Sequence, residues 1–268
     1  MLLFGKNCPN CQSYYDVTLN ECPNCHKSNE LHMQRDVSSE VVFLHPTAQI
    51  GLFLGGFAYA GMLFLEIIVA IFFVGTETNV WKESILMFLT YLLMLGGLIS
   101  IPLFTRKKAF LLKFTRPVDY AFAAFYAGMI ILAGLVISLF VSAFYSGSLS
   151  TGNQNKAVEL IENYPILMFF ASCLIAPICE ELTYRVGLYS FLRRINKVLA
   201  ILVSAFIFAF VHFTFDFNNI AGELLSVPTY FMSGVLLALA YEHRGPACSI
   251  AAHTFYNITA FLTIIMAK

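Results

Sequence analysis

The chain has 268 residues, of which 59% are hydrophobic and only 12% are charged, and its mean hydropathy is +0.74. A soluble domain carries about 25% charged residues, so this composition excludes a water-soluble globule and indicates an integral membrane protein. Sixteen Lys and Arg balance sixteen Asp and Glu, and this neutrality argues against a nucleic-acid partner, which would need a positive field. The first residues, MLLFGKNCPN, lack the basic start and the apolar run of a signal peptide, so we expect no cleavage there.

Two pairs of cysteines open the chain. Cys8-Pro-Asn-Cys11 is followed, after ten residues, by Cys22-Pro-Asn-Cys25. Four thiolates at this spacing can close tetrahedrally on one structural zinc, so residues 1–30 are predicted to form a small zinc ribbon. The alternative, two disulfides, is disfavoured because two-residue loops strain such bridges and because the orientation derived below places this end in the reducing cytosol.

A sharp change in composition separates the ribbon from the rest of the chain. Residues 31–49 are predicted to be a linker, and from residue 50 onward long apolar runs alternate with short polar turns. Runs of this length can cross a hydrocarbon core of about 30 Å, so residues 50–268 are predicted to form an all-α polytopic membrane domain with about seven transmembrane helices. The predicted spans are Ile50–Val74, Ser84–Phe104, Asp119–Tyr145, Pro165–Phe191, Val198–Phe215, Leu224–Tyr241 and Ala247–Ala267.

The basic residues of the short loops predict the orientation, because Lys and Arg mark the cytoplasmic side. Nine of them fall on one side, in the loop after the second span and in the turns after the fourth and sixth, and three fall on the other. We therefore predict a multi-pass protein of the cell membrane with a cytoplasmic N-terminus. The nine are Arg106, Lys107, Lys108, Lys113, Arg116, Arg193, Arg194, Lys197 and Arg244, and the three are Lys82, Lys156 and Lys268.

The fourth span contains ionisable side chains, which are costly in hydrocarbon and usually have a function or a partner there. Glu181 and Arg185 are four residues apart, the spacing of an ion pair on one face of a helix. Glu180 is rotated by about 100° from its neighbour and has no such partner. Pro177, just before these residues, is expected to kink the helix.

Two later spans carry polar groups that are expected at a similar depth. Glu180 lies sixteen residues before Asn196 and His212 sixteen after it, so both rise about 24 Å from this turn in antiparallel helices. From the turn after the sixth span, His253 and Asn257 rise about 14 to 20 Å, and helix tilt or a kink can absorb the difference. Either histidine alone could be an interhelical hydrogen-bonder, but four polar groups at one level predict a site.

The residue types favour hydrolysis by activated water. A desolvated Glu180 can take a proton from water, and His212 can hold the same water or share the proton. His253 and Asn257, one helical turn apart, present two donors to a developing oxyanion. The one-helix zinc-protease motifs HExxH and HxxEH are absent. No Ser or Cys is visibly paired with a base, although Cys179 is next to Glu180.

A metal in the membrane site is a further option. Glu180, His212 and His253 could supply three ligands, whereas a glutamate and a histidine that act on water directly need none. We favour the version without a metal.

Three motifs follow one another in order, on the fourth, fifth and seventh predicted spans. EExxxR is Glu180-Glu181-Leu-Thr-Tyr-Arg185, FxxxH is Phe208-Ala-Phe-Val-His212, and HxxxN is His253-Thr-Phe-Tyr-Asn257. In this order they resemble the motifs of the CPBP intramembrane proteases, also called the Abi or CAAX protease and bacteriocin-processing family. The resemblance covers about residues 165–260. It implies an endopeptidase with the catalytic roles given above, in which Glu181 and Arg185 support the first motif.

The resemblance implies a membrane-associated peptide or protein as substrate. The ribbon lies outside the core of the family, and a zinc held by four cysteines has no open position for water, so we expect this module to tether or dock the N-terminus.

The main alternative is a non-catalytic membrane regulator or immunity protein that binds a membrane partner through the same bundle. A small transporter is disfavoured, because the spans show no inverted repeat. Only the protease hypothesis predicts that activity requires the Glu180 carboxylate.

Overall fold

The computed structural model describes residues 5–8, 10–16, 19, 21–27, 44–58, 80–147 and 149–267. Residues 59–74 of the predicted first span and residues 31–43 of the predicted linker therefore lie outside the described residues. Residues 46–58 form a helix, which begins at Pro46 and so includes the last part of the predicted linker. Proline favours the first turn of a helix because its φ is already helical and its missing N–H is not needed there.

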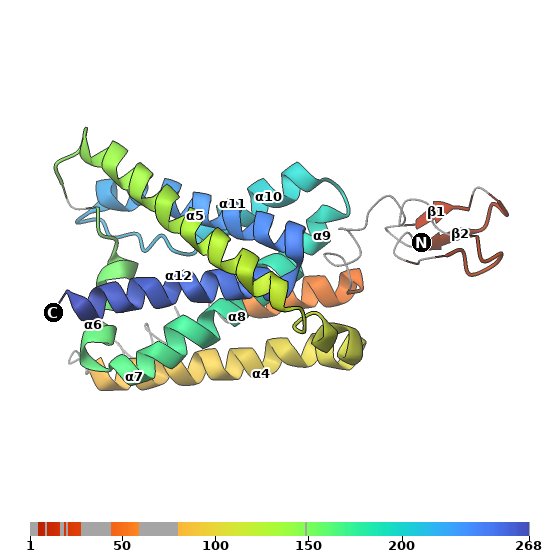
Figure 1. The fold of residues 1–268 in the computed structure, drawn as a ribbon, viewed down its shortest axis with the longest axis horizontal. Coiled ribbons are helices and arrows are strands. Elements are labelled where there is room, and N and C mark those ends of the chain that lie inside the picture. The colour runs from red at the N-terminus through yellow and green to blue at the C-terminus, as the bar shows by residue number, and fades with distance from the viewer. Residues whose placement is uncertain are drawn as a thin grey trace.

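The described helices after residue 79 pack into one bundle (Figure 1). Its helices include α4 (Val80–Leu112), α5 (Pro117–Ser142), α6 (Gly152–Asn163), α10 (Lys197–Phe210), α11 (Ile220–Arg244) and α12 (Pro246–Met266). A continuous central helix consists of α7 (Pro165–Met168), η1 (Phe169–Ile175), α8 (Ala176–Glu181), η2 (Leu182–Tyr189) and α9 (Ser190–Arg193). All eight residues of η2 are buried, so this segment lies in the core of the bundle.

Five helices of the described part are long and apolar enough to cross a membrane. They are Val80–Thr105, Pro117–Ser142, Pro165–Arg193, Ile220–Arg244 and Pro246–Met266. The chain is thus a helical multi-pass membrane protein, as its composition predicts, but the predicted count of seven spans is not confirmed. The predicted fifth span is too long, because α10 has 14 residues and rises only about 21 Å, less than a hydrocarbon core of about 30 Å.

A hydrogen bond from another helix explains why α10 ends early. In a longer helix the Thr214 amide would bond to the carbonyl of Phe210, but it donates instead to Glu223 Oε2 of α11, at 3.1 Å. The Thr214 hydroxyl bonds to the same carboxylate, and such side-chain bonds compete with a helix. His212 therefore lies in the turn after α10 and not within a helix, which corrects the sequence-based prediction.

Two glycines allow helices to approach closely around the central helix. A Cβ at Gly187 of η2 would lie 2.8 Å from the amide nitrogen of Phe53, in the helix of residues 46–58. A Cβ at Gly234 of α11 would lie 2.8 Å from the Cα of Ala205 in α10. Because no side chain fits at either position, the backbones pack directly against each other.

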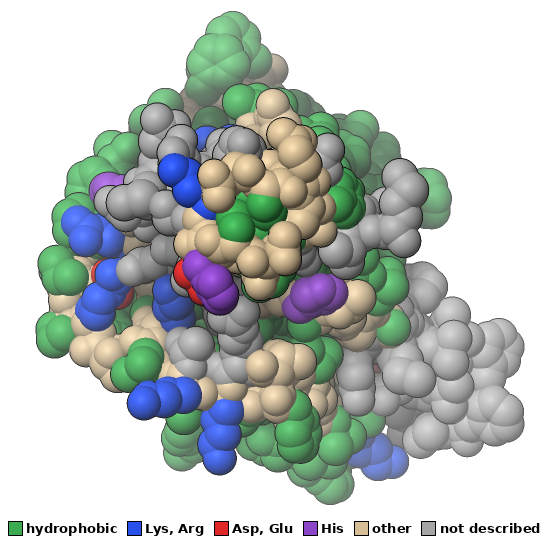
Figure 2. Space-filling model, turned by 90° about the vertical axis from the view of Figure 1, so that its right-hand side faces the viewer, with side chains coloured by type: hydrophobic (Ala, Val, Ile, Leu, Met, Phe, Trp, Pro, Cys, Tyr) green, Lys and Arg blue, Asp and Glu red, His purple; other side chains and the backbone are tan. Residues whose placement is uncertain are grey.

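The basic loops meet at one end of the bundle. Arg116, after α4, donates to the carbonyl of Arg244 at 3.3 Å, and Arg193 pairs with Glu242 at 2.8 Å. Figure 2 views this end and shows Lys and Arg side chains around it. Lys156 lies towards the opposite end, on α6. Although desolvation opposes it, hydrogen bonds to Glu83 and Glu159 raise the pKa of Lys156.

Candidate functional site

The four N-terminal cysteines lie together. Cys8 Sγ is 3.6 Å from Cys25 Sγ, Cys11 Sγ is 3.5 Å from Cys22 Sγ, and all four sulfurs lie within 4.8 Å of one another. Sulfurs bound at about 2.3 Å to one tetrahedral zinc are about 3.8 Å apart, so this spacing fits four-coordination. The four thiols are free, so this cluster could hold a metal ion.

The two cysteine knuckles have the same backbone geometry. The Gln12 amide donates to the Cys8 carbonyl, and the His26 amide donates to the Cys22 carbonyl, both at 2.9 Å. Gln12 and His26 also share a positive φ, of 63° and 55°. The hairpin of β1 (Gly5–Asn7) and β2 (Tyr14–Asp16) includes the first knuckle. The repeated turn orients both cysteine pairs towards one point.

The two glutamates of the first motif end a short α-helical segment, α8, that lies between two π-helical segments. Before it, the amide of Ala176 bonds to the carbonyl of Ala171, five residues back. Pro177 follows directly, and its ring would clash with the carbonyl four residues back in a regular α-helix. The wider π-helical turn accommodates the proline without breaking the helix. The sequence predicts only a kink here.

The predicted ion pair is present and completely buried. Arg185 Nη1 lies 3.0 Å from Glu181 Oε1, and neither side chain is exposed to solvent. Arg185 Nη2 also donates to the Gly234 carbonyl at 3.2 Å, which the close approach of α10 and α11 places within reach. The guanidinium carbon lies 4.6 Å from the centre of the Phe208 ring. The pair therefore joins the first motif to α11 and to the phenylalanine of the second motif.

His253 lies between the two glutamates. Its Nδ1 is 3.1 Å from Glu181 Oε1, and its Nε2 is 3.9 Å from Glu180 Oε2. Because Glu181 is ionised in its pair with Arg185, Nδ1 is the donor of the first contact. The carboxylate of Glu181 thus fixes the ring of His253 and directs Nε2 towards Glu180.

His212 is held by a carbonyl and by an aromatic ring. Its Nδ1 lies 2.7 Å from the Phe208 carbonyl, and since a carbonyl can only accept, Nδ1 carries the hydrogen and Nε2 is the basic nitrogen. The ring stacks on Tyr230 of α11, with centroids 4.7 Å apart and planes at 24°. No hydrogen bond or ion pair joins His212 to Glu180, both of which are described residues.

Asn257 contacts the central helix through a carbonyl that the proline leaves unpaired. In the register of η1, the Ser172 carbonyl would bond to the amide of residue 177, which is a proline and has no N–H. The Asn257 Nδ2 donates to this carbonyl at 2.8 Å. Asn257 therefore has a structural bond that the sequence does not predict, and its second N–H is not part of that bond.

The candidate catalytic groups are gathered less closely than the cysteines. Among the described residues, only the four cysteines bring three or more potential metal-ligand atoms within 4.8 Å of one another. In the membrane site, Glu180, Glu181, Arg185 and His253 form one contacting cluster.

Tyr230 is a residue of the site that sequence reasoning missed. No motif marks it, because one tyrosine in an apolar helix carries no distinctive spacing. Besides stacking on His212, its hydroxyl lies 3.3 Å from Thr151 Oγ1, at the start of α6. Thr151 caps α6 by accepting from the Gln154 amide. Tyr230 thus ties His212 to α6.

Comparison with known proteins identifies the same region of the chain. Residues 162–259 match the family model described as type II CAAX prenyl endopeptidase Rce1-like. The membrane-embedded CAAX protease MroQ of Staphylococcus aureus is 29% identical over 120 residues, which cover 42% of this chain and 44% of that protein. No solved structure matches the chain.

Two other curated relatives carry no statement of activity in their names. UPF0177 protein YvdC of Lactococcus lactis is 28% identical over 141 residues, or 52% of this chain and 51% of that protein. An uncharacterized protein of Mycoplasma capricolum is 29% identical over 157 residues, or 56% and 44%. The chain thus spans about half the length of the curated relatives it matches. The family match and the CAAX protease relative confirm the resemblance of this chain to the CPBP family of membrane proteases.

Proposed function

We propose that this chain is an intramembrane endopeptidase, which hydrolyses a peptide bond of a membrane-associated peptide or protein with water activated by Glu180 and His212. One observation carries the proposal. Glu180 Oε2 is buried, has no hydrogen-bond partner among the described residues and lies 3.9 Å from His253 Nε2, whereas Oε1 of the adjacent Glu181 contacts both Arg185 and His253. A buried carboxylate oxygen without a hydrogen bond is costly for stability alone, and its position beside a histidine supports a role in chemistry.

The proposed reaction begins with a water molecule between Glu180 and His212. The Glu180 carboxylate takes a proton from this water while the water oxygen forms a bond to the carbonyl carbon of the substrate. His212 accepts a hydrogen bond from the same water at Nε2, the nitrogen that its bond to Phe208 leaves basic. The proton then passes to the amine that leaves when the peptide bond breaks.

The oxyanion of the intermediate would be stabilised by Asn257 and His253. Asn257 has a second N–H besides the one bonded to Ser172. His253 would donate through Nε2 when its ring carries two protons, since Nδ1 already donates to Glu181. Glu181 and Arg185 are supporting residues in this scheme, because they position His253 and do not face the water.

The rest of the proposal concerns the domains of the chain, its metal content and its orientation in the membrane. Residues 1–30 would bind one structural zinc through the four cysteines, residues 31–49 would be a linker, and residues 50–268 would form the membrane domain with its protease core at about 165–260. The membrane site would work without a metal. The basic end of the bundle would face the cytoplasm, because Lys and Arg are retained on that side.

The test compares two variants that remove one carboxylate each. Glu180→Gln keeps the shape of the side chain but removes the proton acceptor, so cleavage should fall to background. Glu159→Gln is the matched control, because Glu159 lies on α6, is 45% exposed and, among the described residues, pairs with nearby Lys156. Purified full-length protein in lipid vesicles would be incubated with membrane-embedded peptides, and the products identified by mass spectrometry.

The outcome also decides between the protease and the non-catalytic regulator. Loss of cleavage in Glu180→Gln, with normal membrane insertion and normal activity of Glu159→Gln, supports the protease. Cleavage that persists in a purified Glu180→Gln protein would remove Glu180 as the base. Two results together would favour the regulator. The purified wild-type protein would cleave no peptide, and cells that express the wild type would contain the same secreted and membrane peptides as cells that express Glu180→Gln.

A further inference from the structure

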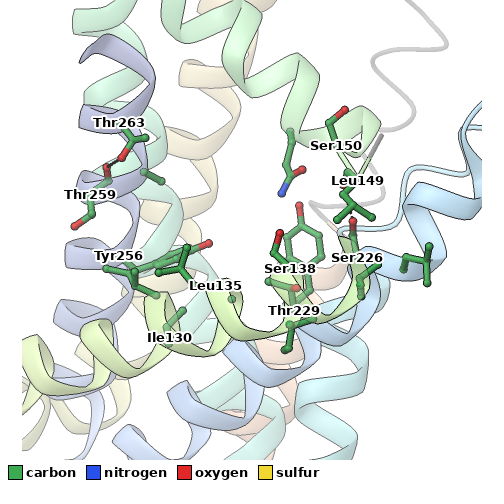
Figure 3. Close-up of a pocket in the computed structure, with 18 residues that line it drawn as sticks. Ile130, Leu135, Ser138, Leu149, Ser150, Ser226, Thr229, Tyr256, Thr259 and Thr263 are labelled. Carbon is green, nitrogen blue, oxygen red and sulfur yellow. Dashed lines mark hydrogen bonds between the residues drawn. The ribbon is translucent and has the colours of Figure 1, made fainter. Parts of the chain in front are cut away.

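A cavity lies beside the candidate site, on the side of His212 that Tyr230 covers. Its volume is about 440 Å³, within the range of about 300–1,000 Å³ typical of ligand sites. It is bounded by α5, α11, α12 and the segment that leads into α6. Figure 3 shows Thr259 and Thr263 of α12 on one side, and Ser150 and Ser226 on the other.

The lining of the cavity is uncharged but rich in hydroxyl groups. Eight of its eighteen lining residues are Ser, Thr or Tyr, one is Gln, and none is Asp, Glu, Lys, Arg or His. Ser226, Thr259 and Thr263 donate their hydroxyl hydrogens to backbone carbonyls, at 2.7 to 2.9 Å. Their oxygens can still accept, so the wall offers acceptors to N–H groups.

This lining fits a peptide backbone better than a lipid chain. A peptide N–H that leaves water must find an acceptor in the protein, and the hydroxyl oxygens of this lining can supply it. An acyl chain could contact the apolar side chains of the lining but has no donor for these oxygens. A charged segment is disfavoured, since no lining side chain would neutralise it.

Two lining residues connect the cavity to the candidate catalytic groups. Tyr230 lines the cavity and stacks on the His212 ring at 4.7 Å between centroids. Tyr256 lines it from α12 and directly precedes Asn257. A ligand in the cavity would therefore be separated from His212 by the Tyr230 ring.

We propose that this cavity binds an uncharged segment of the substrate peptide next to the bond that is cut, with Tyr230 as the wall between that segment and His212. The inference rests on the proposed protease function, whose substrate class it narrows. The protease would then exclude substrates that carry a charged side chain in the segment that the cavity binds.

Two glycines of α5 provide a substitution that fills part of the cavity and a matched control outside it. A Cβ at Gly134, which lines the cavity, would lie 3.6 Å from Thr229 Cγ2, an ordinary contact with another lining residue. A Cβ at Gly128 meets nothing within 4 Å. Gly134→Phe should therefore place a ring in the cavity, whereas Gly128→Phe adds the same ring to the same helix outside it.

The experiment uses full-length protein in vesicles and short, capped, uncharged peptides that carry a photoreactive side chain. Binding is measured by cross-linking in the Glu180→Gln background, and cleavage is measured in the otherwise unchanged protein. Gly134→Phe should lower both cross-linking and kcat/KM about tenfold or more, because the phenyl ring would take up space that the bound segment needs. Gly128→Phe should leave both unchanged.

An Asp in the bound segment should abolish binding, and Ser138→Lys should restore binding of that peptide, because Ser138 lines the cavity.

The possible failures are distinguishable from one another. A peptide that cross-links to the cavity but is never cleaved supports the site and contradicts the protease. Cleavage that is equally fast in Gly134→Phe and Gly128→Phe contradicts the cavity and leaves the protease intact. Labelling of the cavity by a photoreactive phospholipid, with no labelling by the peptides, would assign the cavity to lipid and overturn the inference.

Discussion

Replacing Asn257 with Ala should have two separable effects, one on stability and one on catalysis. The stability effect comes from the Ser172 carbonyl, which Asn257 Nδ2 contacts at 2.8 Å and for which Pro177 provides no amide. Loss of a hydrogen-bond partner by a fully buried carbonyl costs about 1–3 kcal/mol, and we expect the lower end of this range because this bond is only partly buried. The catalytic effect, removal of one oxyanion donor, should lower turnover by roughly 10²- to 10³-fold.

Pro177→Ala separates the two effects, because it gives residue 177 an N–H that can bond to Ser172. In this background Asn257→Ala should cost about 1 kcal/mol less stability than in the wild type, within the range of about 0.5–3 kcal/mol measured for interacting pairs. Pro177→Ala alone should fold, since alanine favours a helix interior. The turnover loss caused by Asn257→Ala should remain.

The assay is a double-mutant cycle on four purified proteins: wild type, Asn257→Ala, Pro177→Ala and the double variant. Thermal unfolding in one detergent gives the stability, and peptide cleavage per folded molecule gives the turnover. An equal stability loss in both backgrounds would refute the argument about the Ser172 carbonyl. Recovery of turnover in the double variant would show that Asn257 acts only through structure.

Three further predictions concern the ion pair, the ribbon and the orientation. Glu181→Ala should destabilise the protein by about 3–5 kcal/mol in the same unfolding assay, because Arg185 would stay buried without its carboxylate; an unchanged melting temperature would contradict this. Cys22→Ser should lower the zinc content from about one atom per chain to near zero by elemental analysis, and an unchanged content would place the metal elsewhere. A reporter that works only in the cytosol should be active when fused after Lys113 and inactive after Asn155, and the reverse pattern would overturn the orientation.

Much of the architecture could be predicted because its cause is local in the sequence. A membrane span is an apolar run, so composition alone located the long helices that begin near residues 80, 117, 165, 220 and 246. The cysteine ribbon depends on two short, identical knuckles. The pair of Glu181 and Arg185 follows from the helical spacing of four residues, and the structure contains it.

The exceptions in the fold depend on contacts that the helical pattern of the sequence does not show. The predicted fifth span is too long because the Thr214 amide bonds to Glu223, nine residues later on another helix. The helix before Pro177 widens to a π-helical turn, and the Ser172 carbonyl bonds to Asn257, 85 residues later. Neither bond follows from the apolar runs that predict the spans.

The sequence by itself determined the chemical inventory of the candidate site: an acid without a counter-charge on its own helix, two histidines and an amide, on three of the apolar segments. Only the tertiary structure decided which partner each group contacts. It directs Glu181 to His253, assigns one N–H of Asn257 to Ser172, and places Tyr230 against His212. The physical reason is that hydrogen bonds and ring stacking depend on distances of a few ångströms between residues far apart in the chain, and these distances are fixed only when the helices pack.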